Sequence, residues 1–127
     1  MTPNVEAIVK GLVAVAWADG RIQKEEREVI TRIAGAFRLT ANEVASIEAY
    51  AKTPRTLDDI SIDVLSASDR RMLLQHALIV TYIDGELLDV ELKLLGDLAQ
   101  RLQIPPDESK SVLDLARERA KHLQPLG

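Results

Sequence analysis

Hydrophobic residues recur along most of this chain at spacings of three and four, which is the pattern of amphipathic helices. Two stretches, about residues 3–18 and 69–83, differ because apolar residues lie on nearly every side of the helix that each would form. Such helices are usually buried within a protein. Together with the amphipathic segments, the pattern predicts six helices, over about residues 3–18, 24–37, 41–52, 69–83, 89–102 and 107–123.

Local signals support several of these helix boundaries. Thr2 and Pro3 suit the N-cap and the first position of the first helix. The capping box Thr40-Ala41-Asn42-Glu43 opens the third helix, and Ser68 is predicted to cap the fourth. Residues 57–65 fit either a short helix or an extended connector. We therefore expect an all-α fold of about seven helices.

The chain contains an internal repeat with an offset of 65 residues. A first half, about residues 5–54, aligns with a second half, about residues 70–119. Each half has an apolar helix, an Asp-Gly loop, an amphipathic helix, a turn and a third helix. Two halves are too few for an open solenoid, so their apolar helices should bury each other in one globule. The identical pairs are Val15/Val80, Asp19/Asp84, Gly20/Gly85, Glu26/Glu91, Ala34/Ala99, Glu43/Glu108, Ser46/Ser111 and Ala51/Ala116.

Composition narrows the classes of function. The 127 residues, 46% of them hydrophobic, predict one domain over residues 1–127. The chain has no cysteine, which excludes disulfides, thiol nucleophiles and cysteine-ligated zinc. A net charge of −4 without a basic stripe argues against nucleic acid as a partner. No signal peptide is evident, and no apolar run approaches the ~20 residues of a membrane span, so we expect a cytoplasmic protein.

Two Asp-Gly loops share one spacing of acidic residues. Each follows the pattern Asp-Gly-x-(Ile/Leu)-x-x-x-Glu, from Asp19 to Glu26 and from Asp84 to Glu91. The same spacing occurs in the second half of a calcium-binding EF-hand loop. A full EF-hand is excluded because the ligand positions of the first half hold apolar or aromatic residues, namely Val15 and Trp17 in one loop and Val80 and Tyr82 in the other.

Three interpretations of these loops remain open. Each Asp can accept backbone N–H bonds across the turn, while each Glu stabilises the first turn of the next helix through the helix dipole. The acids can instead hold Ca²⁺ or Mg²⁺ weakly, with water and backbone carbonyls completing the shell. They can also face a protein partner. The candidate metal ligands are Asp19, Glu26, Asp84 and Glu91, with Glu25 and Glu86 as neighbours.

Other candidate chemistry is sparse. Any histidine-dependent catalysis must use His76 or His122, and we expect a structural role for the first and a solvated position for the second. Trp17 and Tyr82 occupy equivalent repeat positions and are predicted to be core anchors with a polar tip near the loop. Arg70-Arg71 indicates either a solvated pair or a partner surface. No catalytic residues are predicted.

The duplicated unit resembles the tellurite-resistance TerB-like family, which includes the N-terminal domain of a DnaJ-like co-chaperone. The residues that carry the resemblance are Ala16-Trp17-Ala18-Asp19-Gly20-Arg21-Ile22 with Glu25-Glu26, and Tyr82-Ile83-Asp84-Gly85-Glu86-Leu87 with Glu91. It implies an all-helical fold, a role in tellurite or chemical stress, and metal binding by the acidic loop residues. The chain lacks a His-Pro-Asp tripeptide, so no J-domain activity is expected.

These observations predict a non-enzymatic TerB-like module that binds another protein. The alternative is a weak sensor or buffer of divalent metal ions that uses the two acidic loops. A partner protein is expected in the first case, and Ca²⁺ or Mg²⁺ in the second.

Overall fold

The computed structural model describes residues 1–82 and 89–123, with the side chains of all of these except Asp19 and residues 120–123. This part of the chain is helical and contains no strand, which confirms the predicted all-α fold. Its α-helices are α1 (Pro3–Ala16), α2 (Lys24–Ala36), α3 (Ala41–Ala51), α4 (Ala67–Thr81), α5 (Asp89–Arg101) and α6 (Pro106–Leu123). Short 3₁₀ turns are η1 (Trp17–Asp19), η2 (Leu57–Asp59) and η3 (Ile62–Val64).

Capping explains where several helices begin. Pro3 occupies the first turn of α1, as predicted. At α3, Thr40 Oγ1 accepts from the Glu43 backbone N–H at 3.2 Å, and Glu43 Oε1 accepts from the Thr40 N–H at 2.9 Å. The predicted cap of α4 is wrong by two residues: Ser66, not Ser68, caps this helix. Ser66 is the cap because Asp69, three residues later, completes a capping box with it, and both hydrogen bonds measure 3.1 Å.

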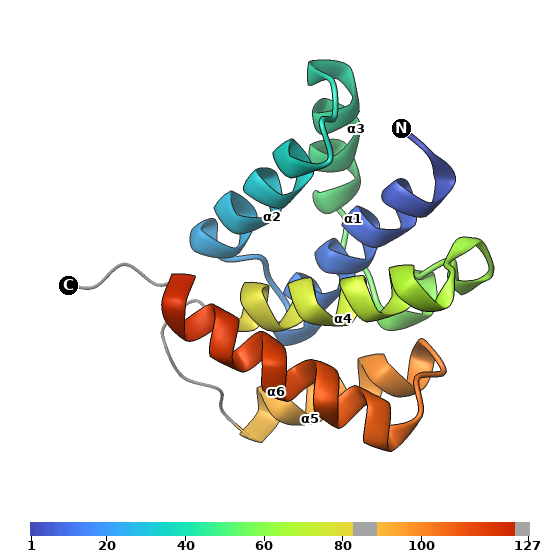
Figure 1. Ribbon diagram of the computed structural model, residues 1–127. Helices are drawn as coiled ribbons and strands as arrows, with labels where there is room; N and C mark the ends of the chain where they lie inside the picture. The colour runs from blue at the N-terminus through green and yellow to red at the C-terminus, as the bar shows by residue number, and fades with distance from the viewer. Residues whose placement is uncertain (83–88, 124–127) are drawn as a thin grey trace.

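The two apolar helices, α1 and α4, pack against each other at the centre of the molecule, as the repeat predicts (Figure 1). An added Cβ at Gly11 of α1 would lie 2.9 Å from a terminal carbon of Leu73 on α4, so this glycine permits the close approach. The residues that are at most 1% exposed come mainly from these helices and α5, and the large ones among them in α1, α4 and α5 are Ile8, Val9, Leu12, Val13, Leu73, Leu74, Leu78, Val80, Leu95 and Leu98.

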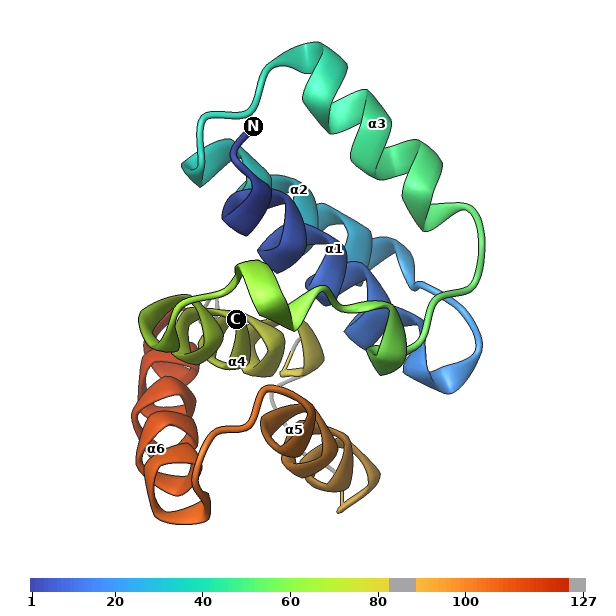
Figure 2. The same cartoon turned by 90° about the vertical axis from the view of Figure 1, so that its right-hand side faces the viewer.

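The two halves stack on each other but are not packed alike. Helices α1–α3 form one half and α4–α6 the other, as both views show (Figures 1 and 2). In the second half α6 lies along α4 over a long contact, whereas in the first half α3 contacts α1 much less. Figure 2 shows α3 standing away from the other helices of its half. The halves share a topology and differ in how their third helix closes.

The connector between the halves, residues 57–65, combines the two conformations that its sequence allows, a short helix and an extended segment. It forms the 3₁₀ turns η2 and η3 within otherwise extended backbone, and it buries Ile60 and Leu65. Arg70 donates hydrogen bonds to the carbonyls of Leu65, Ile62 and Leu102. The connector carbonyls of Leu57, Asp58 and Ile60 accept hydrogen bonds from Arg101 of α5.

Arg70 and Arg71 are therefore not a solvated pair. Arg70 ties the connector to the second half, and Arg71 Nη1 forms an ion pair with Glu108 Oε1 of α6 at 2.7 Å. Arginine suits the first role because its planar guanidinium offers several N–H donors in a fixed fork.

Within residues 1–82 and 89–123, every helix is too short or too polar to span a bilayer.

Candidate functional site

The structure brings together two of the acids that the repeat singles out. Glu26 of α2 and Glu91 of α5 both line one hollow of about 350 Å³ at the carboxyl ends of α1 and α4. The hollow is also lined by Thr81, Lys93 and Asp97, together with apolar residues of α1 and α5. Equivalent glutamates from the two halves thus meet on one surface, a placement that the loop spacing alone does not predict.

Glu26 has a local structural role. Its Oε1 accepts a hydrogen bond from the Gln23 backbone N–H at 2.8 Å, which satisfies a free donor at the start of α2. Gly20, just before this helix, has a left-handed backbone with φ of +94°, as predicted for the glycine that ends the first helix. Glu26 thus lies in the first turn of α2, where the structural interpretation of the loop places it.

A metal centre is not assembled by the described residues. Among the described side chains, which exclude those of Asp19 and His122, no three from His, Asp or Glu lie close enough to share an ion. Glu25 is exposed on the first turn of α2. The other candidate ligands, the Asp19 side chain with Asp84 and Glu86, lie outside the described residues. Lys93, a cation, also lines the hollow that Glu26 and Glu91 share.

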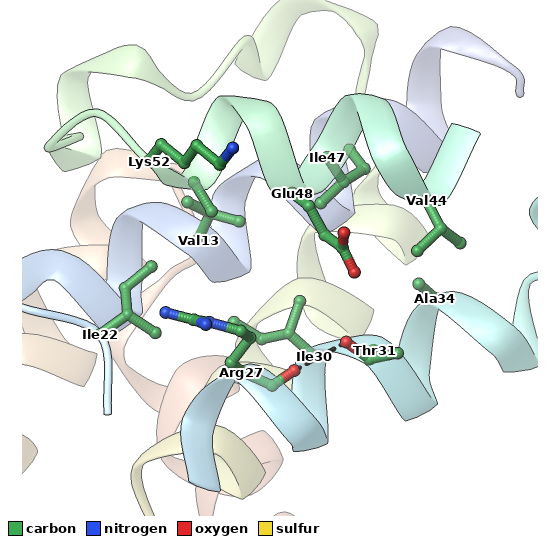
Figure 3. Close-up of a pocket in the computed structure, with 11 residues that line it drawn as sticks. Val13, Ile22, Arg27, Ile30, Thr31, Ala34, Val44, Ile47, Glu48 and Lys52 are labelled. Atoms are coloured by element: carbon green, nitrogen blue, oxygen red, sulfur yellow. Dashed lines mark hydrogen bonds between the residues drawn. The ribbon is translucent and has the colours of Figure 1, made fainter. Parts of the chain in front are cut away.

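A second hollow, which the sequence did not indicate, lies between α2 and α3. We call it the α2–α3 groove; its volume is about 270 Å³ (Figure 3). Ile30 and Ala34 of α2 face Val44 and Ile47 of α3, and Val13 of α1 also lines the groove. The full set of lining residues is Val13, Ile22, Arg27, Ile30, Thr31, Ala34, Val44, Ile47, Glu48, Ala51 and Lys52.

Charged side chains border these apolar walls. Arg27 lies on α2, while Glu48 and Lys52 lie on α3 and at its C-cap. All three residues are exposed, and in the described part of the chain none of the three side chains has a hydrogen-bond or ion-pair partner. The site therefore combines an apolar interior with free charges at its rim, which is the usual composition of a binding site.

One end of the groove is held by a tryptophan. Trp17 Nε1 donates to the carbonyl oxygen of Ala51 at 2.9 Å, which links η1 to the last turn of α3. Trp17 is half-buried and packs against the core, so the predicted anchor with a polar tip is confirmed for this residue. The bond fixes the distance between α1 and the end of α3 and leaves the space beside α2 open.

The repeat shows why the same space is closed in the second half. The residue equivalent to Glu48 is Leu113, which is partly buried and packs against the core. Arg27 corresponds to Leu92, which is exposed on α5. The first half thus carries charged residues where the second half carries leucines. Comparing the halves position by position is the sequence signal that would have pointed to the groove.

His76 is packed, as predicted, and lies apart from both hollows. Its ring meets the Phe37 ring edge-on, with 6.2 Å between the ring centres. Burial lowers the pKa of His76, because the charged form loses hydration. Its buried Nδ1 has no hydrogen-bond partner among the described residues.

Comparison with known proteins places the chain in a family. A family model described as "Protein of unknown function (DUF533)" matches residues 2–115, which include the first repeat and most of the second. No curated protein and no solved structure matches the chain. The matched family is TerB-like, in agreement with the resemblance carried by the two Asp-Gly units. The chain belongs to the DUF533 family of proteins of unknown function.

Proposed function

We propose that this chain is a non-enzymatic protein-interaction module that binds a segment of a partner protein in the α2–α3 groove. The groove itself is the observation that supports the proposal: apolar walls from α2 and α3 remain open in the first half, while α6 closes on α4 in the second. Amphipathic segments bind such grooves by inserting apolar side chains between two helices.

The dimensions of the groove suit the side chains of a partner segment. Its volume is about 270 Å³. A few leucine-sized or isoleucine-sized side chains would suit this space and its walls. Burying them would supply the binding energy, because each such side chain contributes roughly 1.5–3 kcal/mol when fully removed from water.

Selection of peptides from a displayed random library tests this function. We expect the wild-type chain to enrich peptides with apolar residues at spacings of three and four, and Val44→Phe to bind them poorly. In Figure 3 Val44 points across the groove toward Ala34, so a phenyl ring at this position would fill the space. Ala45→Phe, at an exposed position of the same helix, is the matched control. Enrichment that Val44→Phe does not reduce would contradict the proposal.

The cellular role that we propose follows from the resemblance of the two Asp-Gly units to the TerB-like family. That family is linked to tellurite and chemical stress, and it includes TerB and a DnaJ-like co-chaperone domain. We infer a cytoplasmic adaptor in such a response. Expression of the wild-type chain in a tellurite-sensitive bacterium should raise its tolerance, whereas Val44→Phe should not. Equal tolerance with both chains would separate the groove from this role.

A second candidate function is weak binding of Ca²⁺ or Mg²⁺ at the acidic loops. It is supported by the meeting of Glu26 and Glu91 on one hollow. In this case millimolar calcium should shift the amide signals of Gly20 and Gly85 saturably in NMR spectra, and Asp84→Asn should abolish the shifts of the second loop. If calcium moves neither signal, the metal function is excluded.

A further inference from the structure

The rim of the α2–α3 groove is not uniform in charge. Figure 3 shows Arg27 and Lys52 on opposite walls toward the end where Ile22 lies, with Glu48 and Val44 further along. Two cations without partners in the described residues therefore border one end of the groove. The local charge is opposite in sign to the net charge of −4 of the whole chain.

The internal repeat makes this charge arrangement specific to the open half. The residues equivalent to Arg27 and Glu48 are Leu92 and Leu113, while Lys52 corresponds to Arg117. At these positions the second half therefore lacks a pair of cations on opposite helices. Because the open half differs from it in packing and in charge at the same positions, both differences fit a surface that receives a separate segment.

Cations on opposite walls favour one kind of occupant. An acidic side chain that lies between Arg27 and Lys52 could interact with both, one from each helix. Apolar side chains next to it would then reach the walls formed by Ile30 and Ile47. A basic residue at the same place would meet like charges, and such repulsion is a common source of specificity.

We propose that the partner segment is an amphipathic helix that places an acidic residue between Arg27 and Lys52 and apolar residues on Ile30 and Ile47. This inference rests on the proposed interaction function and adds the chemistry of the partner. The apolar contacts provide most of the affinity, and the two cations select the sign of the charge beside them.

Two synthetic peptides of equal length test the proposal. Both carry leucines at spacings of three and four; the flanking turns hold glutamates in one peptide and lysines in the other. Fluorescence anisotropy should show tighter binding of the glutamate peptide, although the whole chain is acidic. The double variant Arg27→Glu/Lys52→Glu should weaken that binding about tenfold, since two exposed charge pairs are lost. Added salt should weaken binding to the wild type in the same direction.

The control variant changes net charge equally elsewhere. Arg32→Glu/Lys110→Glu alters two exposed residues that do not line the groove, so it should leave binding of the glutamate peptide within about twofold of wild type. If both peptides bind equally and Val44→Phe still blocks them, the charge selection is wrong while the groove function stands. If neither peptide binds, or Val44→Phe has no effect on binding, both the charge selection and the groove function are wrong.

Discussion

One position of the repeat has opposite consequences in the two halves. Gly11 and His76 are equivalent under the offset of 65 residues. The glycine brings α1 against Leu73 of α4, whereas the histidine reaches the Phe37 ring from the middle of α4. Side-chain size at this position therefore helps to set how closely each apolar helix is approached.

Substitutions of two helical glycines should change stability in opposite directions. Gly11→Val should lower the free energy of unfolding by about 1–3 kcal/mol, because its side chain collides with the buried Leu73. Gly96→Ala should raise it by roughly 0.5–1 kcal/mol, since an added Cβ meets nothing within 4 Å and alanine favours the helix. Urea denaturation followed by circular dichroism measures both. A neutral Gly11→Val would show that the helices approach less tightly than described.

His76 should make stability depend on pH. Its pKa is lowered in the folded chain by burial, so the unfolded chain binds a proton more readily. Stability from this residue is complete above the unfolded pKa of about 6.5 and falls as the pH drops toward the folded value. Denaturation of wild type and His76→Leu at pH 7.5 and 5.5 tests this, because His122 is common to both. The wild type should lose more stability on acidification; an equal loss would refute the role of His76.

Helix boundaries and the connector depend on side chains that satisfy backbone groups. Helix α4 begins after Ser66 because a reciprocal pair with Asp69 satisfies two N–H groups. Few hydrogen bonds join backbone groups within the connector. Arginines from α4 and α5 donate hydrogen bonds to its carbonyls instead. Its extended path is thus held by elements far away in the sequence.

Neighbouring arginines should differ in their contribution to stability. Arg70→Ala should cost about 2–3 kcal/mol, because three backbone carbonyls lose a charged donor. Arg71→Ala should cost at most about 1 kcal/mol, since it removes one ion pair between half-exposed side chains. Hydrogen exchange should also show faster exchange of the amides of residues 60–65 in Arg70→Ala alone. Equal effects of both changes would rule out the tethering role of Arg70.

The two halves of the molecule share one hydrophobic core, so we expect them to unfold as one cooperative unit. The apolar faces of α1 and α4 bury each other, so neither half encloses its own hydrophobic residues. The groove reaches the edge of this core, since the buried residues Val13, Ile30, Ala34 and Ile47 line it between α2 and α3. A binding surface can therefore remain open while the centre stays closely packed.

Separating the halves should abolish folding. A fragment of residues 1–65 keeps α1 but exposes the side chains of Val9 and Leu12, which are 0% exposed in the full chain. Circular dichroism should show low helicity and no cooperative thermal transition for this fragment, and mixing it with residues 66–127 should restore both signals. A cooperative transition of the isolated fragment would show that each half is an independent domain.

The acidic loops mark the limit of prediction from spacing. The sequence indicated Glu26 and Glu91 as equivalent, and the structure adds that both line one hollow. That placement depends on how the halves stack, which no local pattern encodes. The hydrogen bond from the Gln23 N–H to Glu26 follows from local sequence, because the two residues stand three apart at a helix start.

By itself, the sequence determined the all-α class, the approximate helix ranges, the repeat and the central burial of two apolar helices, because periodicity and capping act over a few residues. Tertiary structure alone decided that α6 closes on α4 while α3 stands off α1. It also decided that Arg27 and Lys52 border one groove. The physical reason is that helix packing depends on the shapes of many side chains that are distant in the sequence, whereas the formation of each helix depends on its own side chains.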